Sequence, residues 1–219
     1  MYNRINFELE PGSAAPNNAV MREKLPAVRC PSDSSRQPSG SYGPTNYLAC
    51  RGTAVSSDAR TYSLSIPVAA SGEVNSMFRM NNIVRIRDVE DGTTNTMMVS
   101  ETFASAPLCT EQPSGGACPT ACTSLGGNTT GAQQGYSWMW GQLYESHYYG
   151  TVYTPNSPTP DCGGGSSSTS ALLAARSKHV GGVHVLLGDG STRFASENID
   201  INIWRNLGNY NDGNVMGEW

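Results

Sequence analysis

The clearest alternation of apolar and polar positions in this chain lies close to its C-terminal end. Two apolar runs, 183–187 and 192–195, flank the segment Gly188-Asp189-Gly190-Ser191. Tight hairpin turns need positive φ angles, which glycine adopts at little cost. We therefore predict a β-hairpin here. Further on, Asp200 is expected to cap a short helix that runs to about Leu207.

A second block of the same kind lies in the middle of the chain. Residues 83–86 are apolar and β-branched, Asp91-Gly92 is a turn pair, and 96–100 read as a buried strand that ends at Glu101. Two such runs around turn residues favour a hairpin.

Weaker patterns predict further short elements. They are a helix from Asn17 or Asn18 to about Leu25, ended by Pro26, a turn at 30–33, a strand over 45–49, an alternating segment over 62–68 and a helical turn over 172–177. Tyr136, Trp138 and Trp140 alternate, so we expect them on one face of a strand. The fold class that follows is mainly β (α+β), an antiparallel sheet with short helices. We expect one domain over 1–219, with loop insertions at about 105–135 and 154–170.

The composition indicates the environment in which the protein works. The 219 residues include 24 Gly and 13 Pro, with 37% hydrophobic and only 15% charged residues. Such a balance is typical of a loop-rich extracellular protein. The net charge is −4 and Lys and Arg form no block, so we expect neither nucleic acid nor an anionic membrane surface as a partner. The sequence holds no apolar run of membrane-spanning length.

The cysteines are even in number and lie among small polar residues, which favours disulfides in an oxidising compartment. They are Cys30, Cys50, Cys109, Cys118, Cys122 and Cys162. We favour a local Cys30–Cys50 bridge, with the other four stapling the long insertion. The alternative is a zinc site built from Cys118 and Cys122 with Cys109, Cys162 or a histidine, although the spacing fits zinc poorly.

Three segments carry a family resemblance. The first is Cys30-Pro31-Ser32-Asp33 followed by Thr45-Asn46-Tyr47. The second is Val89-Glu90-Asp91-Gly92-Thr93-Thr94-Asn95-Thr96 through Glu101. The third is KHVGGVHVLLGDGSTRF over 178–194, in which His179 precedes Asp189-Gly190 by nine intervening residues. In this order they resemble the planctomycete-type prepilin-like family with a processing-associated H-x9-DG domain, related to type IV pilins and type II secretion pseudopilins.

The resemblance implies a structural protein and not an enzyme. It implies the globular head of an extracellular or cell-surface filament subunit, exposed to the periplasm during assembly, whose partners are further copies of itself. Members of this family begin with a basic leader and a hydrophobic helix, and the resemblance starts downstream of those. We expect any membrane contact to come through that N-terminal helix. The motif residues are then expected to shape turns. They are His179, Gly181, Gly182, Asp189, Gly190, Asp91, Gly92, Asn95 and Glu101.

Catalysis and metal binding are the alternatives to this structural role. His179 and Asp189 with Ser177 or Ser191 would suggest a hydrolase, but no nucleophile elbow accompanies them. His179 and His184 are five residues apart, so in one strand they would point to opposite faces, which argues against a histidine metal site that would include His147. We expect no cofactor. Structural calcium at Asp91, Asp189 and Asp212 is the one candidate, since turn carboxylates suit hard cations.

An aromatic-rich stretch gives the remaining binding alternative, a surface module for glycans or proteins. Trp138, Trp140, Tyr144, Tyr148 and Tyr149 could stack on sugars, but core packing or a subunit interface suits them better. Asn128-Thr129-Thr130 is a glycosylation-type triplet, so we expect a candidate glycan attachment there.

Overall fold

The computed structural model describes residues 1–9, 16–34, 42–53, 76–78, 83–104, 106–107, 109, 133–139, 148–163, 171–214 and 217–219. Its helices are η1 Tyr2–Arg4, α1 Asn17–Met21, η2 Pro26–Val28, η3 Ile86–Asp88 and α2 Ile201–Leu207. Its strands are β1 Tyr47–Cys50, β2 Met97–Glu101, β3 Ala106–Pro107, β4 Gln133–Gln134, β5 Tyr148–Tyr149, β6 Cys162–Gly163, β7 Ala171–Leu172, β8 Gly182–Leu187 and β9 Thr192–Ser196.

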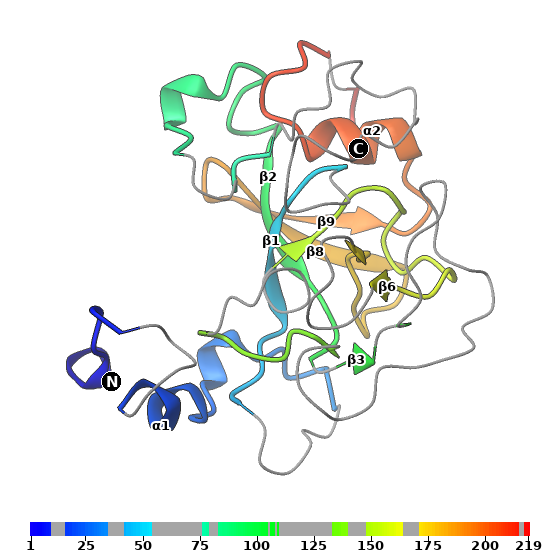
Figure 1. The fold of residues 1–219 in the computed structure, drawn as a ribbon. Helices are drawn as coiled ribbons and strands as arrows, with labels where there is room; N and C mark the ends of the chain where they lie inside the picture. Colours follow the sequence, from blue (N-terminus) through cyan, green and yellow to red (C-terminus); the bar gives the residue numbers. More distant parts are fainter. Residues whose placement is uncertain are drawn as a thin grey trace.

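The centre of the protein is a five-stranded sheet in the order β5-β1-β2-β8-β9 (Figure 1). The pairs β1–β2, β2–β8 and β8–β9 are antiparallel. β1 and β5 run parallel, so the purely antiparallel sheet that we expected is wrong. The long chain between β1 and β5 allows this return to the sheet edge in the same direction. The protein is therefore α+β, with a mixed sheet.

The main core lies on one face of this sheet. Alternate residues of β8 point into it, namely Val183, Val185 and Leu187, as the period of two requires. Helix α2 covers them with Trp204 and Leu207, both fully buried. Figure 1 shows α2 beside the upper end of the sheet, above β9.

The C-terminal hairpin and its following helix confirm the sequence-based predictions. β8 and β9 pair over the register Gly182↔Ser196 to Leu186↔Thr192, and Gly190 in the turn has φ +85°. Asp200 caps α2, since its Oδ1 accepts the N–H groups of Asn202 and Ile203 at 2.8 and 3.2 Å. β2 likewise ends at Glu101, and Gly92 in the preceding turn has φ +91°. These elements are encoded locally.

Four of the predicted elements differ in the structure. Residues 83–86 form no strand, because Ile83 and Ile86 are exposed and η3 begins at Ile86. Residues 172–177 form no helical turn, and Leu172 instead ends β7, which pairs with β6. The chain over 136–139 is not a strand. Helix α1 stops at Met21 and its N-cap is Pro16, because the Asn17 side chain binds the backbone of Asn6 instead. The alternating segment 62–68 lies outside the described residues.

Candidate functional site

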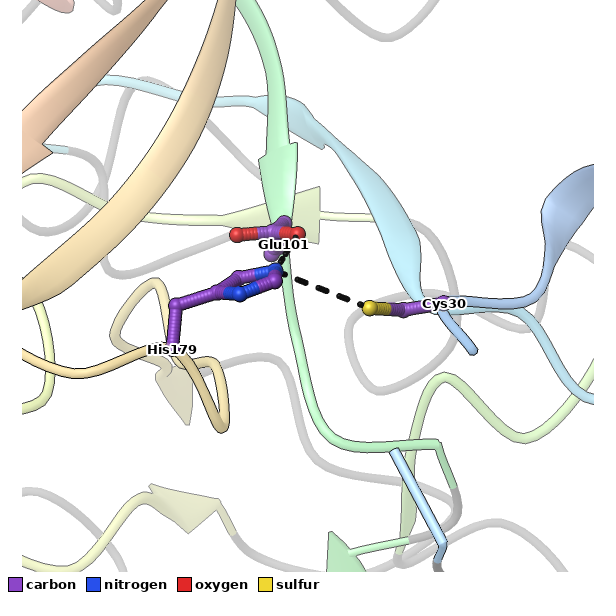
Figure 2. A group of neighbouring side chains, drawn as sticks. All are labelled: Cys30, Glu101 and His179. Carbon is purple, nitrogen blue, oxygen red and sulfur yellow. Dashed lines mark hydrogen bonds and ion pairs between the residues drawn. The ribbon is translucent and has the colours of Figure 1, made fainter. Parts of the chain in front are cut away.

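Three segments far apart in the sequence meet on the sheet face opposite the main core. Glu101 ends β2, His179 lies in the turn before β8, and Cys30 follows η2. Figure 2 shows their side chains pointing toward one another. His179 Nε2 lies 3.1 Å from Glu101 Oε1 and 3.7 Å from Cys30 Sγ. One residue from each of the three sequence landmarks thus contributes to a single cluster.

The Glu101 carboxylate is held at both oxygens. Oε2 accepts the backbone N–H of His184 at 2.8 Å, and the ring Nδ1 of His184 lies 3.4 Å from the same oxygen. Oε1 faces His179. The residue is only 4% exposed, so its orientation is fixed by these partners.

The Cys30 backbone is held by a buried asparagine. Asn46 Oδ1 accepts the Cys30 N–H at 3.0 Å, and Asn46 Nδ2 donates to Asp33 Oδ2 at 2.5 Å and to Thr102 O at 2.8 Å. Asp33 Oδ2 also accepts the N–H of Ala104 at 2.9 Å. One amide therefore ties the 30–33 turn and β1 to the chain that leaves β2.

A pocket of about 450 Å³ opens over this cluster. Its lining includes Cys30, Tyr47, Glu101, His179 and His184. Burial raises the pKa of the Tyr47 phenol, and the negative charges of Cys30 and Glu101 add to the rise. The pocket wall thus carries one carboxylate, one phenol and two imidazoles.

The two histidines correct one of our expectations. Their rings are in edge-to-face contact, with centroids 4.8 Å apart. We expected opposite faces, but only His184 belongs to β8, and His179 precedes the strand in a turn that brings its ring back. The ring of His184 also packs against Phe194 at 5.2 Å.

The His179–Asp189 pair of the hydrolase alternative is not brought together. The six residues of β8 lie between them, and His179 turns to Glu101 instead. Asp189 is exposed, and its Oδ1 accepts the hydroxyl and the N–H of Ser191 at 2.7 and 2.8 Å. The hydrogen bond from the Ser191 hydroxyl is the main cause of a lowered pKa of Asp189, and the bond from the Ser191 N–H adds to it. Asp189 therefore acts in the hairpin turn.

The cluster also differs from a Cys-His-acid triad. In such a triad the histidine uses one ring nitrogen for the nucleophile and the other for the acid. Here the same atom, Nε2, faces both Cys30 and Glu101. The three atoms converge on one point. The two nitrogens of the His179 ring therefore do not link Cys30 to Glu101 as they would in a triad.

The second and third landmarks are joined through the backbone. The amides of Asp189 and Gly188 donate to Thr93 O and Thr96 O at 3.1 and 2.9 Å. Asn95 Nδ2 donates to Asp91 O at 3.1 Å. The GDG turn is therefore docked on the DGT turn.

Of the calcium candidates, Asp91 lies beside Asp212, and Asp189 has its own turn partner. The two Asp91 oxygens accept the N–H groups of Asp212 and Gly213 at 2.8 and 2.9 Å. Within the described ranges, the one group of three metal-ligating side chains is Cys30, Glu101 and His179. Asp91 and Asp189 accept hydrogen bonds from turn N–H groups. The described geometry therefore gives no support to a calcium site at these residues.

The cysteine pairing that we expected near the N-terminus is wrong. Cys30 and Cys50 are free and buried, because Cys50 points into the main core whereas Cys30 faces the pocket. Cys109 and Cys162 are disulfide-bonded. Cys118 and Cys122 lie outside the described residues, so the pairing of these four stays a prediction.

The described aromatic residues of the candidate stripe serve packing. Tyr149 is 1% exposed and packs near Trp204 in the core, and Tyr136 is buried beside Tyr42. The indole N–H of Trp138 donates to Glu23 O at 2.9 Å, and Tyr148 packs under the Arg51 guanidinium. Trp140, Tyr144, His147 and the triplet at 128–130 lie outside the described residues.

Sequence reasoning missed three roles at this site. We expected Cys30 in a disulfide, and we expected no particular contact for Asn46 or His184. The three landmarks themselves were the available signal, because each of them contributes one residue to the cluster.

The fold and site define a class: an α+β protein in which an H-x9-DG hairpin completes a mixed sheet and places its histidine on a buried glutamate. Residues 1–202 match the model of a family described as a protein of unknown function (DUF1559). The chain belongs to this family, the planctomycete prepilin-type domain family. No curated protein and no solved structure matches it. Within the described segments, no helix is both long and apolar enough to cross a membrane.

Proposed function

We propose that this protein is the extracellular head of a pilus or pseudopilus subunit, which acts by self-assembly and not by catalysis. The family supports this through its prepilin-type character. The observation that carries the proposal is a pair of exposed apolar patches at opposite ends of the molecule.

The first patch, which we call the N-terminal patch, consists of Met1, Tyr2, Phe7 and Leu9. Tyr2 and Phe7 are 73% and 67% exposed, and their ring centroids lie 5.1 Å apart. Large apolar side chains that gather at one surface site favour a contact with another protein.

The second patch, which we call the η3 patch, consists of Ile83 and Ile86, which are 83% and 73% exposed. In Figure 1 the N-terminal segment, in blue, lies at the lower left, and η3, in blue-green, lies at the upper left, near the opposite end of strands β1 and β2. A contact between two different patches is heterologous, and when it does not close into a ring it generates a filament. Opposite placement suits such head-to-tail growth.

The acidic side chains of the sequence landmarks also favour a structural role. Glu101 Oε2 accepts the His184 N–H, and Asp91 and Asp189 accept N–H groups in turns. The disulfide-bonded state of Cys109 and Cys162 supports an oxidising, extracellular compartment.

Electron microscopy of cells that express the protein from its own gene tests the proposal. The unaltered protein should give surface filaments. Tyr2→Ser with Phe7→Ser, and separately Ile83→Ser with Ile86→Ser, should each remove most of them, because each pair carries one half of the contact. The matched control is Val180→Ser, since Val180 is 98% exposed and belongs to neither patch.

The melting temperature of each purified variant should stay close to that of the parent, because the substituted side chains are exposed and hold no core. Two results would contradict the proposal. One is dispersed monomers from the unaltered protein. The other is normal filaments from both patch variants.

A further inference from the structure

Cys30, Glu101 and His179 each present one metal-ligating atom to the same small volume. The three atoms, a thiol sulfur, a carboxylate oxygen and an imidazole nitrogen, all lie within 4.8 Å of one another. Figure 2 shows the side chains converging from three separate backbone segments. Convergence of this kind is the basic requirement of a metal site.

The spacing fits a tetrahedral ion. With Zn–S about 2.3 Å and with Zn–N and Zn–O each about 2.0 Å, tetrahedral geometry puts sulfur and nitrogen about 3.5 Å apart and nitrogen and oxygen about 3.3 Å apart. Cys30 Sγ and His179 Nε2 are 3.7 Å apart, and His179 Nε2 and Glu101 Oε1 are 3.1 Å apart. Two of the three edges therefore match this geometry, and the third, between Cys30 Sγ and Glu101 Oε1, lies within 4.8 Å, so these two ligands would move toward each other on binding an ion.

The charges around the cluster also favour a cation. Glu101 is 4% exposed, and among the described residues its carboxylate has hydrogen bonds or ion pairs with His179 and His184 and none with a Lys or Arg side chain. A buried carboxylate is costly unless a positive charge compensates it. Cys30 is a free, buried thiol beside this carboxylate, and a sulfur ligand of this kind suits a divalent ion such as zinc.

The surroundings hold the ligands as metal sites usually do. The His184 N–H anchors Oε2 of Glu101, which leaves Oε1 directed at the cluster, and Asn46 fixes the Cys30 backbone. Hydrogen-bonded ligands of this sort are typical of metal sites. The adjoining pocket, about 450 Å³, leaves room for a water molecule as a fourth ligand.

We propose that Cys30, Glu101 and His179 bind a zinc ion through Sγ, Oε1 and Nε2, with the fourth position open to the pocket. A mixed sulfur, nitrogen and oxygen set suits zinc, whereas calcium and magnesium prefer oxygen ligands throughout. The ion would clamp the 30–33 turn, the end of β2 and the turn before β8 together.

Metal titration of the tag-free, chelator-treated protein tests this. We expect calorimetry to show one zinc ion per chain at this site, and Co²⁺ to give the near-ultraviolet charge-transfer band of a thiolate ligand. Cys30→Ser should abolish that band and weaken zinc binding at least about tenfold. Glu101→Gln and His179→Gln should weaken zinc binding while Co²⁺, at saturating concentration, keeps the band. The matched control is Cys50→Ser, which removes the other free thiol of the described part and should leave the affinity unchanged.

A second measurement uses the unaltered protein, so it does not depend on whether the variants fold. In the unaltered protein, zinc should protect Cys30 from alkylation by iodoacetamide, as mapped by mass spectrometry. The site is overturned if zinc gives Cys30 no protection, or if folded Cys30→Ser and His179→Gln bind zinc as the parent does. These assays use the monomer, so their failure would leave the filament proposal standing.

Discussion

The two free cysteines of the described part have opposite surroundings, although they lie only twenty positions apart in the sequence. Cys50 is fully buried in the main core, and this burial raises the pKa of its thiol from 9.0 to about 11. Cys30 borders the pocket beside His179 and Glu101. Cys30 is therefore the thiol that borders the pocket, while Cys50 behaves as a small apolar core residue.

The raised pKa of Cys50 predicts a loss of stability in alkali. Between its ordinary pKa of 9.0 and its folded pKa of about 11, the unfolded chain releases a proton that the folded chain keeps. The contribution of Cys50 to the free energy of unfolding is thus complete below pH 9.0 and declines as the pH rises through about 11. Burial also raises the pKa of Tyr149, with the same sign.

Urea unfolding across this pH window measures the effect. Cys50→Ala should show a shallower decline than the parent, because it has no thiol to titrate, even though it is less stable at neutral pH by about 1 kcal/mol from lost core packing. Parallel pH profiles for the two proteins would show that the thiol does not contribute.

At the scale of the element, the β8–β9 hairpin depends on two glycines for different reasons. Gly190 needs its φ of +85°, and an added Cβ would meet nothing within 4 Å. Gly182 lies in β8, where an added Cβ would come 2.0 Å from Ala195 O in the paired strand. The first glycine allows a backbone angle, and the second allows close pairing.

Alanine substitutions should separate these two reasons. Gly190→Ala should destabilise the protein by about 1 kcal/mol, the cost of a left-handed angle. Gly182→Ala should cost about 3 kcal/mol, because the strands must move apart. The control is Gly217→Ala, where an added Cβ meets nothing within 4 Å. Urea unfolding measures all three, and equal losses at Gly182 and Gly190 would contradict the close-pairing explanation.

How much could be predicted from the sequence also depends on the element. The hairpin, the Asp200 cap and the end of β2 were predicted because neighbouring residues decide them. The helical turn predicted over 172–177 is wrong because Leu172 pairs with Cys162 of β6, ten positions earlier in the chain. Ile83 and Ile86 have strand-forming side chains, but exposure shows that propensity alone did not decide their structure.

At the scale of the whole molecule, the candidate site could not be assembled from sequence spacing. His179 is 78 residues from Glu101 and 149 residues from Cys30. Only the sheet order, with β2 between β1 and β8, brings these positions together. The family landmarks identified the residues, and the topology supplied the contacts.

The filament proposal also belongs to this scale, since it depends on two patches that no single element contains. Head-to-tail growth requires the N-terminal patch of one copy to meet the η3 patch of the next. An isologous contact would instead pair each patch with itself and stop at a dimer. The order of the cross-linked products distinguishes these arrangements.

Cysteine cross-linking in cells tests the central claim most directly. Phe7→Cys and Ile86→Cys would be combined in a Cys30→Ser background and oxidised on the cell surface. We predict a ladder of dimers, trimers and longer products on a non-reducing gel, and no ladder when either new cysteine is present alone. Monomers only, or a dimer that forms equally well from one of the single cysteines, would contradict head-to-tail assembly through these patches.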